Sequence, residues 1–458
     1  MNTKTNNILK RQYGLFTAIC LVVGSVIGTG IFWLPGRVLH QAGGDLWTGV
    51  FAWIVGGTMV ATCVYMFSVM ARRYEMVHGM VDYAEALVGK KYGYLAAWFF
   101  CVMYQTAGYA IIAWITANFT ATLAGLNSRD HFMIIFGIML FYMVTIFVLN
   151  YFVPKLPMKF HVSSTVARII PLILVAIIGV IAGLLMGDSQ ILGYVVVPEL
   201  ANQPEPSFLG AVFATAFAYN GWQAATAFNS EINDSKKKFP FALMIGFALV
   251  MVIYVGYYVG IVSSGDPYDL MRNNQLATRA VFNSLFGDLI GNVMMIFVII
   301  SGLGILNLCC MGMSRSLYAL GRRGNGPVPH VTVALDERTG LPLKSMVICV
   351  VLSFVWAVII FGNHNWWTNF EFNLPNFYNT LFFTLLIPIF IGFFIHNRMN
   401  KAIHPFNRLI MPFVATFGAA FMNYSLISSS FIHAVVYYAV GIILAAIGFI
   451  FFRNKTTA

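Results

Sequence analysis

The sequence predicts an all-α protein that crosses a membrane many times. Of its 458 residues, 59% are hydrophobic and only 9% are charged, whereas soluble domains carry about a quarter charged residues. The apolar runs reach about 20 residues or more, the length an α-helix needs to cross roughly 30 Å of hydrocarbon. They are continuous rather than alternating, which excludes a closed β-barrel.

Twelve apolar segments are long enough to be transmembrane helices. The loops between them are short, so we expect residues 1–458 to form a single transmembrane domain. The first run is too long for the core of a signal peptide and is kept as the first helix. The twelve expected spans are 14–40, 46–70, 94–124, 132–153, 162–186, 207–231, 240–263, 286–319, 345–362, 374–396, 408–428 and 432–452.

The basic residues predict the orientation. If the N-terminus is cytoplasmic, most of the 27 Lys and Arg residues fall on the inner side, as the positive-inside rule requires. Only Arg37, Arg129, Arg272 and Arg279 fall toward the outside, and Arg168 lies within a span. We therefore expect a multi-pass protein of the cell membrane with both termini cytoplasmic. The net charge of +11 is then explained by topology and lipid contacts rather than by nucleic-acid binding.

The cysteines and histidines indicate neither a metal nor a cofactor. All six cysteines lie within spans and are interpreted as small apolar packing residues. The nine histidines lie mainly at loops and span ends, whereas a membrane-embedded enzyme should cluster titratable groups inside its spans. A receptor should add a signalling domain or tail, for which the chain has no room. A channel is harder to dismiss on these grounds.

The first span contains "GSVIGTGIFWLPG" (24–36), with four glycines and Pro35. Gly24 and Gly28 form a GxxxG pair, which allows close helix packing. However, Gly28-Thr29-Gly30 exceeds what packing requires, and "FAYNGW" (217–222) places a turn-forming Asn220-Gly221 pair inside the sixth span. Paired interruptions favour two broken helices over packing alone.

The positions of the two interruptions predict an internal repeat. If 14–186 is one unit of five spans, 207–396 is a second unit inserted upside down, and 408–452 adds two helices. Paired broken spans point to a transporter binding site. The N-terminus of a half-helix attracts an anion and the free carbonyls attract a cation. An α-amino acid carries both charges, so alternating access by a transporter is favoured over a channel.

Three motifs resemble the amino acid–polyamine–organocation (APC) superfamily, especially its L-type exchangers and bacterial serine/threonine exchangers. They are "GSVIGTGIF" (24–32), "AFAYNGW" followed by "EINDSKKKFPFAL" (216–222 and 231–243), and "SRSLYALGRRGNGPVP" (314–329). The resemblance extends over all twelve spans in order. It implies a LeuT-type fold with a 5+5 inverted repeat in which helices 1 and 6 are broken.

The resemblance also implies site residues. The substrate carboxylate would meet the N–H groups of Gly28, Thr29 and Gly30, and Phe217 would be an aromatic gate. Asn307 would face the substrate side chain. The sequence departs from the family at three positions. Asn220 stands where the family often has glycine or aspartate, and Ser235 where it usually has proline. Leu308 stands where the family often has a glycine directly after the equivalent of Asn307. The substrate ammonium would meet carbonyls near Val26 and Ile27 and around Phe217, Ala218 and Asn220.

Arg168 is a charged residue inside the fifth span, which marks it as a functional candidate. Related transporters often have a lysine here. The residue is interpreted either as a cation anchored by backbone carbonyls at the inner end of broken helix 1 or as a conformational coupling group. Because arginine effectively never loses its proton, both interpretations disfavour proton release.

The expected substrate is a neutral amino acid, because no span centre contributes a carboxylate that would pair with a cationic side chain. Glu231, Glu75, Asp82 and Glu85 lie at the cytoplasmic side. Aromatic surface could come from Tyr104, Tyr109 and Trp114. The favoured mode is exchange; a proton-coupled symporter and an amino-acid/amine antiporter stay open. The sequence identifies no ancillary subunit.

Overall fold

In a computed structural model of the protein, the described residues are 14–73, 79–126, 130–153, 156–185, 205–226, 232–336, 341–366 and 370–452. Nearly all of them are helical, and within these ranges no β-strand forms, which confirms the all-α prediction. The first half contains α1 (Leu15–Val26), α2 (Gly30–Trp33), α3 (Pro35–Gln41), α4 (Leu46–Arg73), α5 (Met80–Val88), α6 (Lys90–Trp98), η1 (Phe99–Tyr104), α7 (Gln105–Leu123), α8 (Phe132–Phe152), α9 (Leu156–Leu174), η2 (Val175–Gly179) and α10 (Val180–Leu185).

The second half contains α11 (Phe208–Tyr219), α12 (Trp222–Thr226), α13 (Ser235–Ser264), α14 (Pro267–Arg272), α15 (Asn274–Arg322), α16 (Pro329–Thr332), α17 (Leu343–Asn365), α18 (Leu374–Asn397), η4 (Phe406–Ile410), α19 (Met411–Ser429) and α20 (Phe431–Ile450). Eleven helical segments of the described chain are long and apolar enough to cross a membrane. The expected span 207–231 is not among them because it is divided into α11 and α12, and 227–231 lie outside the described residues.

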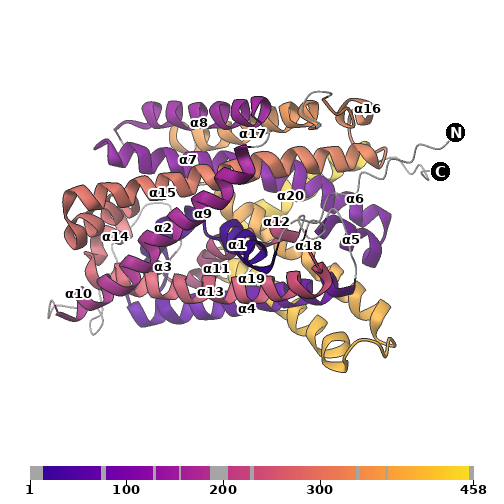
Figure 1. Ribbon diagram of the computed structural model, residues 1–458, viewed down its shortest axis with the longest axis horizontal. Coiled ribbons are helices and arrows are strands. Elements are labelled where there is room, and N and C mark those ends of the chain that lie inside the picture. Colours follow the sequence, from indigo (N-terminus) through magenta and orange to yellow (C-terminus); the bar gives the residue numbers. More distant parts are fainter. Residues whose placement is uncertain are drawn as a thin grey trace.

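The helices form a bundle in which α7, α8, α15 and α17 lie along one side and α4 and α13 along the other (Figure 1). α1 and α9 pass between these groups and contact each other. α10 and α14 lie at one end of the bundle, and α5 and α16 at the opposite end. α10 and α14 thus share one end of the bundle, the end that the charge distribution predicts to be the outer side.

Two helices differ from the sequence-based boundaries. α15 as a whole begins at Asn274, but Gly287 (φ 79°, ψ 161°) is non-helical and divides it at a kink, so the part that follows this glycine begins close to the expected boundary at 286. Only glycine adopts this backbone conformation readily. The third span contains a π-helical stretch, η1, between α6 and α7. π-turns of this kind widen a helix locally and are frequent at functional sites.

The end of the bundle where α5 lies is joined by an ion-pair cluster. Arg323, which follows α15, donates from Nη2 to Asp82 Oδ1 at 2.5 Å and from Nε to Glu85 Oε2 at 3.0 Å. Both carboxylates lie on α5, in a segment that the sequence suggested was an inner loop. The two carboxylates therefore face Arg323 rather than the centre of the spans.

Candidate functional site

The first span is interrupted over Ile27, Gly28 and Thr29. α1 ends at Val26 because Ile27 has extended backbone (φ −70°, ψ 105°), and α2 begins at Gly30. In the described part of the chain, no acceptor meets the N–H groups of Gly28, Thr29 and Gly30. The Thr29 hydroxyl is also buried without a hydrogen-bond partner there. These donors lie where a carboxylate can be received.

The sixth span is interrupted at Asn220 and Gly221, as the sequence predicted. α11 ends at Tyr219, Asn220 is extended (φ −83°, ψ 168°), and α12 begins at Trp222. Gly221 has φ 107°, a conformation suited to glycine. A methyl group on Gly221 would lie 2.1 Å from the carbonyl oxygen of Ser25. The two breaks are therefore in direct backbone contact, and only glycine permits it.

Arg168 holds the first break from α9. Its side chain is fully buried, and Nη1 donates to Gly24 O at 2.5 Å and to Ile27 O at 2.7 Å. Nε and Nη2 donate to Ser164 O and Oγ, at 3.1 and 2.7 Å. The break removes the backbone donors that would otherwise reach these carbonyls, and the guanidinium replaces them.

Tyr254 of α13 touches both breaks at once. Its hydroxyl lies 3.1 Å from Val26 O, at the end of α1, and 3.2 Å from Ala218 O, near the end of α11. Sequence analysis did not single out this residue. Of the carbonyls expected to meet the ammonium group, that of Ile27 accepts from Arg168, and those of Val26 and Ala218 share the single proton of the Tyr254 hydroxyl. A carbonyl has two lone pairs and can accept once more.

Phe217 lies against Gly30. A methyl group on Gly30 would be 2.9 Å from two carbons of the Phe217 ring. The ring packs edge-on against Trp33, with centroids 6.3 Å apart, and lies at the same distance from Tyr378 of α18. The predicted gate residue and the predicted carboxylate site are therefore neighbours.

Asn307 of α15 is fixed by a second asparagine. Its Oδ1 accepts from Nδ2 of Asn150, on α8, at 2.8 Å. Two other parts of α15 face the first break: Ile305, whose Cγ1 would be 3.1 Å from a methyl group on Gly28, and Gly302, which lies beside Thr29. The structure thus adds Ile305 and Gly302 to the surroundings of the site.

Comparison with known proteins assigns the family. Residues 13–455 match the amino acid permease family. The chain belongs to this family. It is 27% identical over 327 residues to the serine/threonine exchanger SteT of Bacillus subtilis, covering 71% of this chain and 72% of that protein. It is 23% identical over 471 residues to the Asc-type amino acid transporter 1 of Mus musculus, covering 98% and 82%.

A third relative is the large neutral amino acids transporter small subunit 2 of Homo sapiens, 24% identical over 358 residues. The match covers 76% of the permease but 64% of the human protein, less than two thirds of its length. These comparisons confirm the resemblance that the three motifs indicated. The permease is a multi-pass amino acid transporter.

Two hydrogen bonds of side-chain amides lie beside the second break, and sequence analysis did not predict either of them. Asn220 Nδ2 donates to Oδ1 of Asn379, on α18. Gln223 Nε2 donates to the hydroxyl of Tyr104, at the end of η1, while its Oε1 accepts from Gly221 N at 3.1 Å. An asparagine or a glutamine in a span does not indicate which residue will pair with it, and only the fold brings these partners together.

The three span-three aromatic residues have different surroundings. Tyr104 reaches the second break, whereas Tyr109 donates to Met143 O of α8 at 2.6 Å and so joins two helices. Trp114 packs on Phe132 near the outer end, with centroids 5.4 Å apart. Glu75 and Glu231, which were expected at the inner side, lie outside the described residues.

Proposed function

We propose that the permease exchanges neutral amino acids across the cell membrane by alternating access, with each substrate bound between the two helix breaks. The single observation that carries this proposal is the pairing of unlike backbone groups. Free N–H donors occupy the first break, and the C-terminal end of α11 directs carbonyls toward the second. A carboxylate and an ammonium group on one carbon complement these two ends.

A neutral side chain is favoured by the groups around the breaks. Phe217, Tyr378 and Tyr104 supply aromatic surface, and the amides of Asn220 and Gln223 supply hydrogen-bonding groups without charge. Among the described residues, Arg168 is the one charged side chain that we find bonded to a break, and its guanidinium donates to backbone carbonyls there. A cationic side chain buried here would lack a counter-ion, which is costly.

The packing of the helices supports an inverted repeat of 14–186 and 207–396, followed by 408–452. α7 packs on α15, and α4 packs on α13. These are the third with the eighth span and the second with the seventh, equivalent positions in two five-span units. α8 contacts α15 as α17 contacts α7, which the same pseudo-symmetry requires. The proposed orientation places both termini in the cytoplasm.

Exchange is favoured over proton coupling because Arg168 supplies a fixed charge rather than an exchangeable proton. The similarity to a serine/threonine exchanger points the same way. The remaining candidates are a proton-coupled symporter and an amino-acid/amine antiporter, which the following measurement separates from exchange.

Purified permease in proteoliposomes should take up radiolabelled neutral amino acid rapidly when the vesicles are preloaded with amino acid. Empty vesicles with an inward proton gradient should accumulate little. Amino-acid amides and decarboxylated amines should compete poorly, because each lacks one of the two charges. Proton-driven accumulation would identify a symporter, and acceleration by an internal amine would identify an amino-acid/amine antiporter.

A further inference from the structure

Two adjoining cavities open at the end of the bundle where α14 lies. The larger has a volume of about 280 Å³ and is bordered by α2, α7, α8, α17 and the residues before α18. The smaller, of about 40 Å³, lies between α3, α11, α19 and α20. Glu371 and Asn373 line both. The larger volume is close to the lower limit of about 300 Å³ for drug-sized ligands, so it has room for an amino acid, which is smaller than these. Arg37 lines only the smaller cavity, so a ligand must lie at the boundary that Glu371 shares to reach both side chains.

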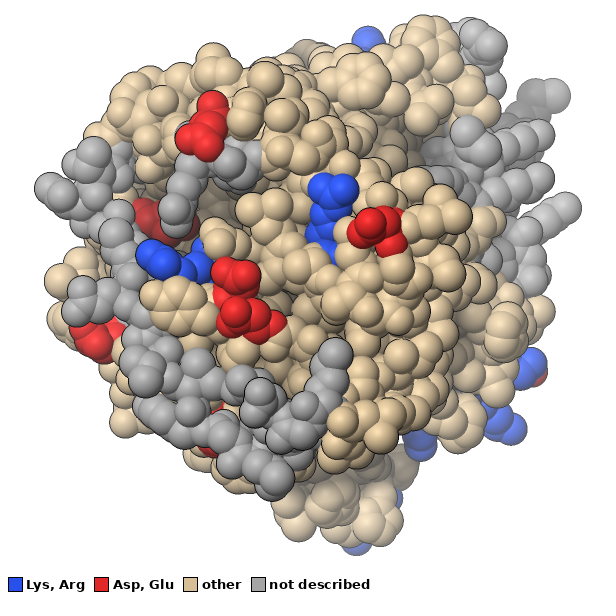
Figure 2. Space-filling model, turned by 90° about the vertical axis from the view of Figure 1, so that its left-hand side faces the viewer, with Lys and Arg blue, Asp and Glu red and all other residues tan. Residues whose placement is uncertain are grey.

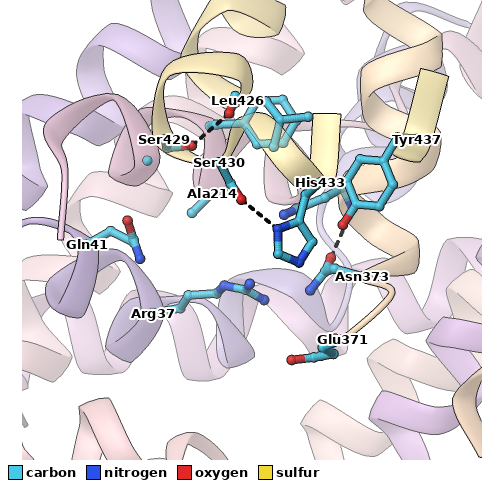
Figure 3. A pocket seen from close by; sticks show the side chains of 13 residues that line it. Arg37, Gln41, Ala214, Glu371, Asn373, Leu426, Ser429, Ser430, His433 and Tyr437 are labelled. Carbon is cyan, nitrogen blue, oxygen red and sulfur yellow. Dashed lines mark hydrogen bonds between the residues drawn. The ribbon is translucent and has the colours of Figure 1, made fainter. Parts of the chain in front are cut away.

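Apart from the imidazoles of His364 and His433, the two cavities are lined by one basic and one acidic side chain. Of the residues lining either cavity, Arg37 is the only Lys or Arg and Glu371 the only carboxylate. The described residues include no ion pair between them. Figure 3 shows the guanidinium and the carboxylate on the same side of the His433 ring. Figure 2 shows that both basic and acidic side chains lie near the middle of this end of the molecule.

The cavities are connected to the gate through Trp33. The guanidinium carbon of Arg37 lies 5.6 Å from the centroid of the Trp33 ring, a cation–π contact. Trp33 lines the larger cavity and packs edge-on against Phe217. Phe217 in turn covers Gly30. A ligand held between Arg37 and Glu371 would therefore lie next to the aromatic residues that cover the substrate site.

We propose that these cavities form an entry site for the zwitterionic headgroup of an incoming amino acid. Arg37 receives the α-carboxylate, for which a planar guanidinium offers paired donors, and Glu371 receives the α-ammonium. The ligand waits there until Phe217 and Trp33 move. The inference rests on the proposed function, since it assigns the same substrate a second, outer position.

The test compares Arg37→Gln and Glu371→Gln with matched charge removals on the same face. Arg272→Gln and Asp269→Asn are the controls, because both side chains are exposed on α14 and line neither cavity. In exchange assays the two entry-site variants should raise the external KM about three- to fivefold, the range of partly exposed ion pairs. The maximum rate and the KM for internal substrate should stay unchanged, and the controls should match the unmodified protein.

Three results would overturn the entry site. A lower maximum rate with unchanged external KM would mean that Arg37 and Glu371 only close on each other as a gate. Equal KM increases in the controls would reduce the effect to general surface charge. If the unmodified permease exchanges no amino acid, the proposed function fails separately. Equilibrium binding of radiolabelled serine to the same purified variants then decides the entry site, which is wrong if all bind equally.

Discussion

The two helix breaks are stabilised by different chemistry. In the first, a buried guanidinium from α9 occupies the carbonyls of Gly24 and Ile27. In the second, the backbone turns at Gly221, with neutral amide contacts from Asn220 to α18 and from Gln223 to η1. Tyr254 is the element they share, because its hydroxyl reaches one carbonyl of each.

Because their stabilising contacts differ, we expect the two breaks to differ in how easily they move. The guanidinium makes four hydrogen bonds in a fully buried position, so releasing the first break exposes a charge and several carbonyls together. The amide contacts of the second break can be exchanged for equivalent contacts to water or substrate. We therefore expect the second break to rearrange more easily, with the first moving as a unit with α9.

Replacing Arg168, whose guanidinium clamps the carbonyls of the first break, should have the largest effect. Arg168→Met leaves two carbonyls without donors, at about 1–3 kcal/mol each, and exchange should be abolished in proteoliposomes. Arg168→Lys keeps the charge but has all its N–H donors on one nitrogen instead of spread over a planar guanidinium, so it should retain partial activity. Arg279→Met is the control, since it also removes an Arg–carbonyl bond, to Thr122 O, but at the outer end of α7. Full activity of Arg168→Met would contradict the clamp.

The contact between the breaks should give the next effect. Gly221→Ala places a methyl group against the backbone of Ser25 and strains a positive φ, costing about 1–3 kcal/mol, so exchange should fall about tenfold or more. In Gly30→Ala the methyl group meets the Phe217 ring, which can rotate, and the loss should be smaller. Comparing initial exchange rates at equal amounts of folded protein tests the order. Equal losses of exchange rate in the two variants would show that the close approach of Gly221 to the backbone of Ser25 is not needed for transport.

The shared hydroxyl should give the smallest effect. Tyr254→Phe removes one donor from two carbonyls, a net change of about 0.5–1.5 kcal/mol, and the exchange rate should fall about three- to tenfold. Tyr109→Phe also removes a buried tyrosine bond to a backbone carbonyl, but between α7 and α8. If both variants lose the same activity, Tyr254 contributes only to general stability.

How much of the site the sequence predicts depends on whether a feature is local in the chain or requires a contact between separate helices. The breaks are local, since Gly28-Thr29-Gly30 and Asn220-Gly221 weaken a helix wherever they occur, and the structure places both interruptions there. Arg168 is visible because a charge in an apolar run is unusual. Tyr254, Asn379 and Gln223 carry no such signal, because each partner lies on a separate helix. The roles proposed for Asn307 and for the free N–H groups stay predictions.

The π-helical stretch η1 adds one residue to a turn of the third span. Trp356 Nε1 donates to Val102 O within this stretch, at 2.9 Å, so a side chain from α17 supports the widened turn. Each residue of an α-helix advances by about 100°. Deleting one residue from a regular α-helix would turn all the following side chains by that angle, whereas deleting one from the π-helical stretch 99–104 would restore regular winding and largely keep the faces on either side. Span three can therefore lose one residue in this stretch and stay helical, at the expense of the widened turn from which Tyr104 contacts Gln223.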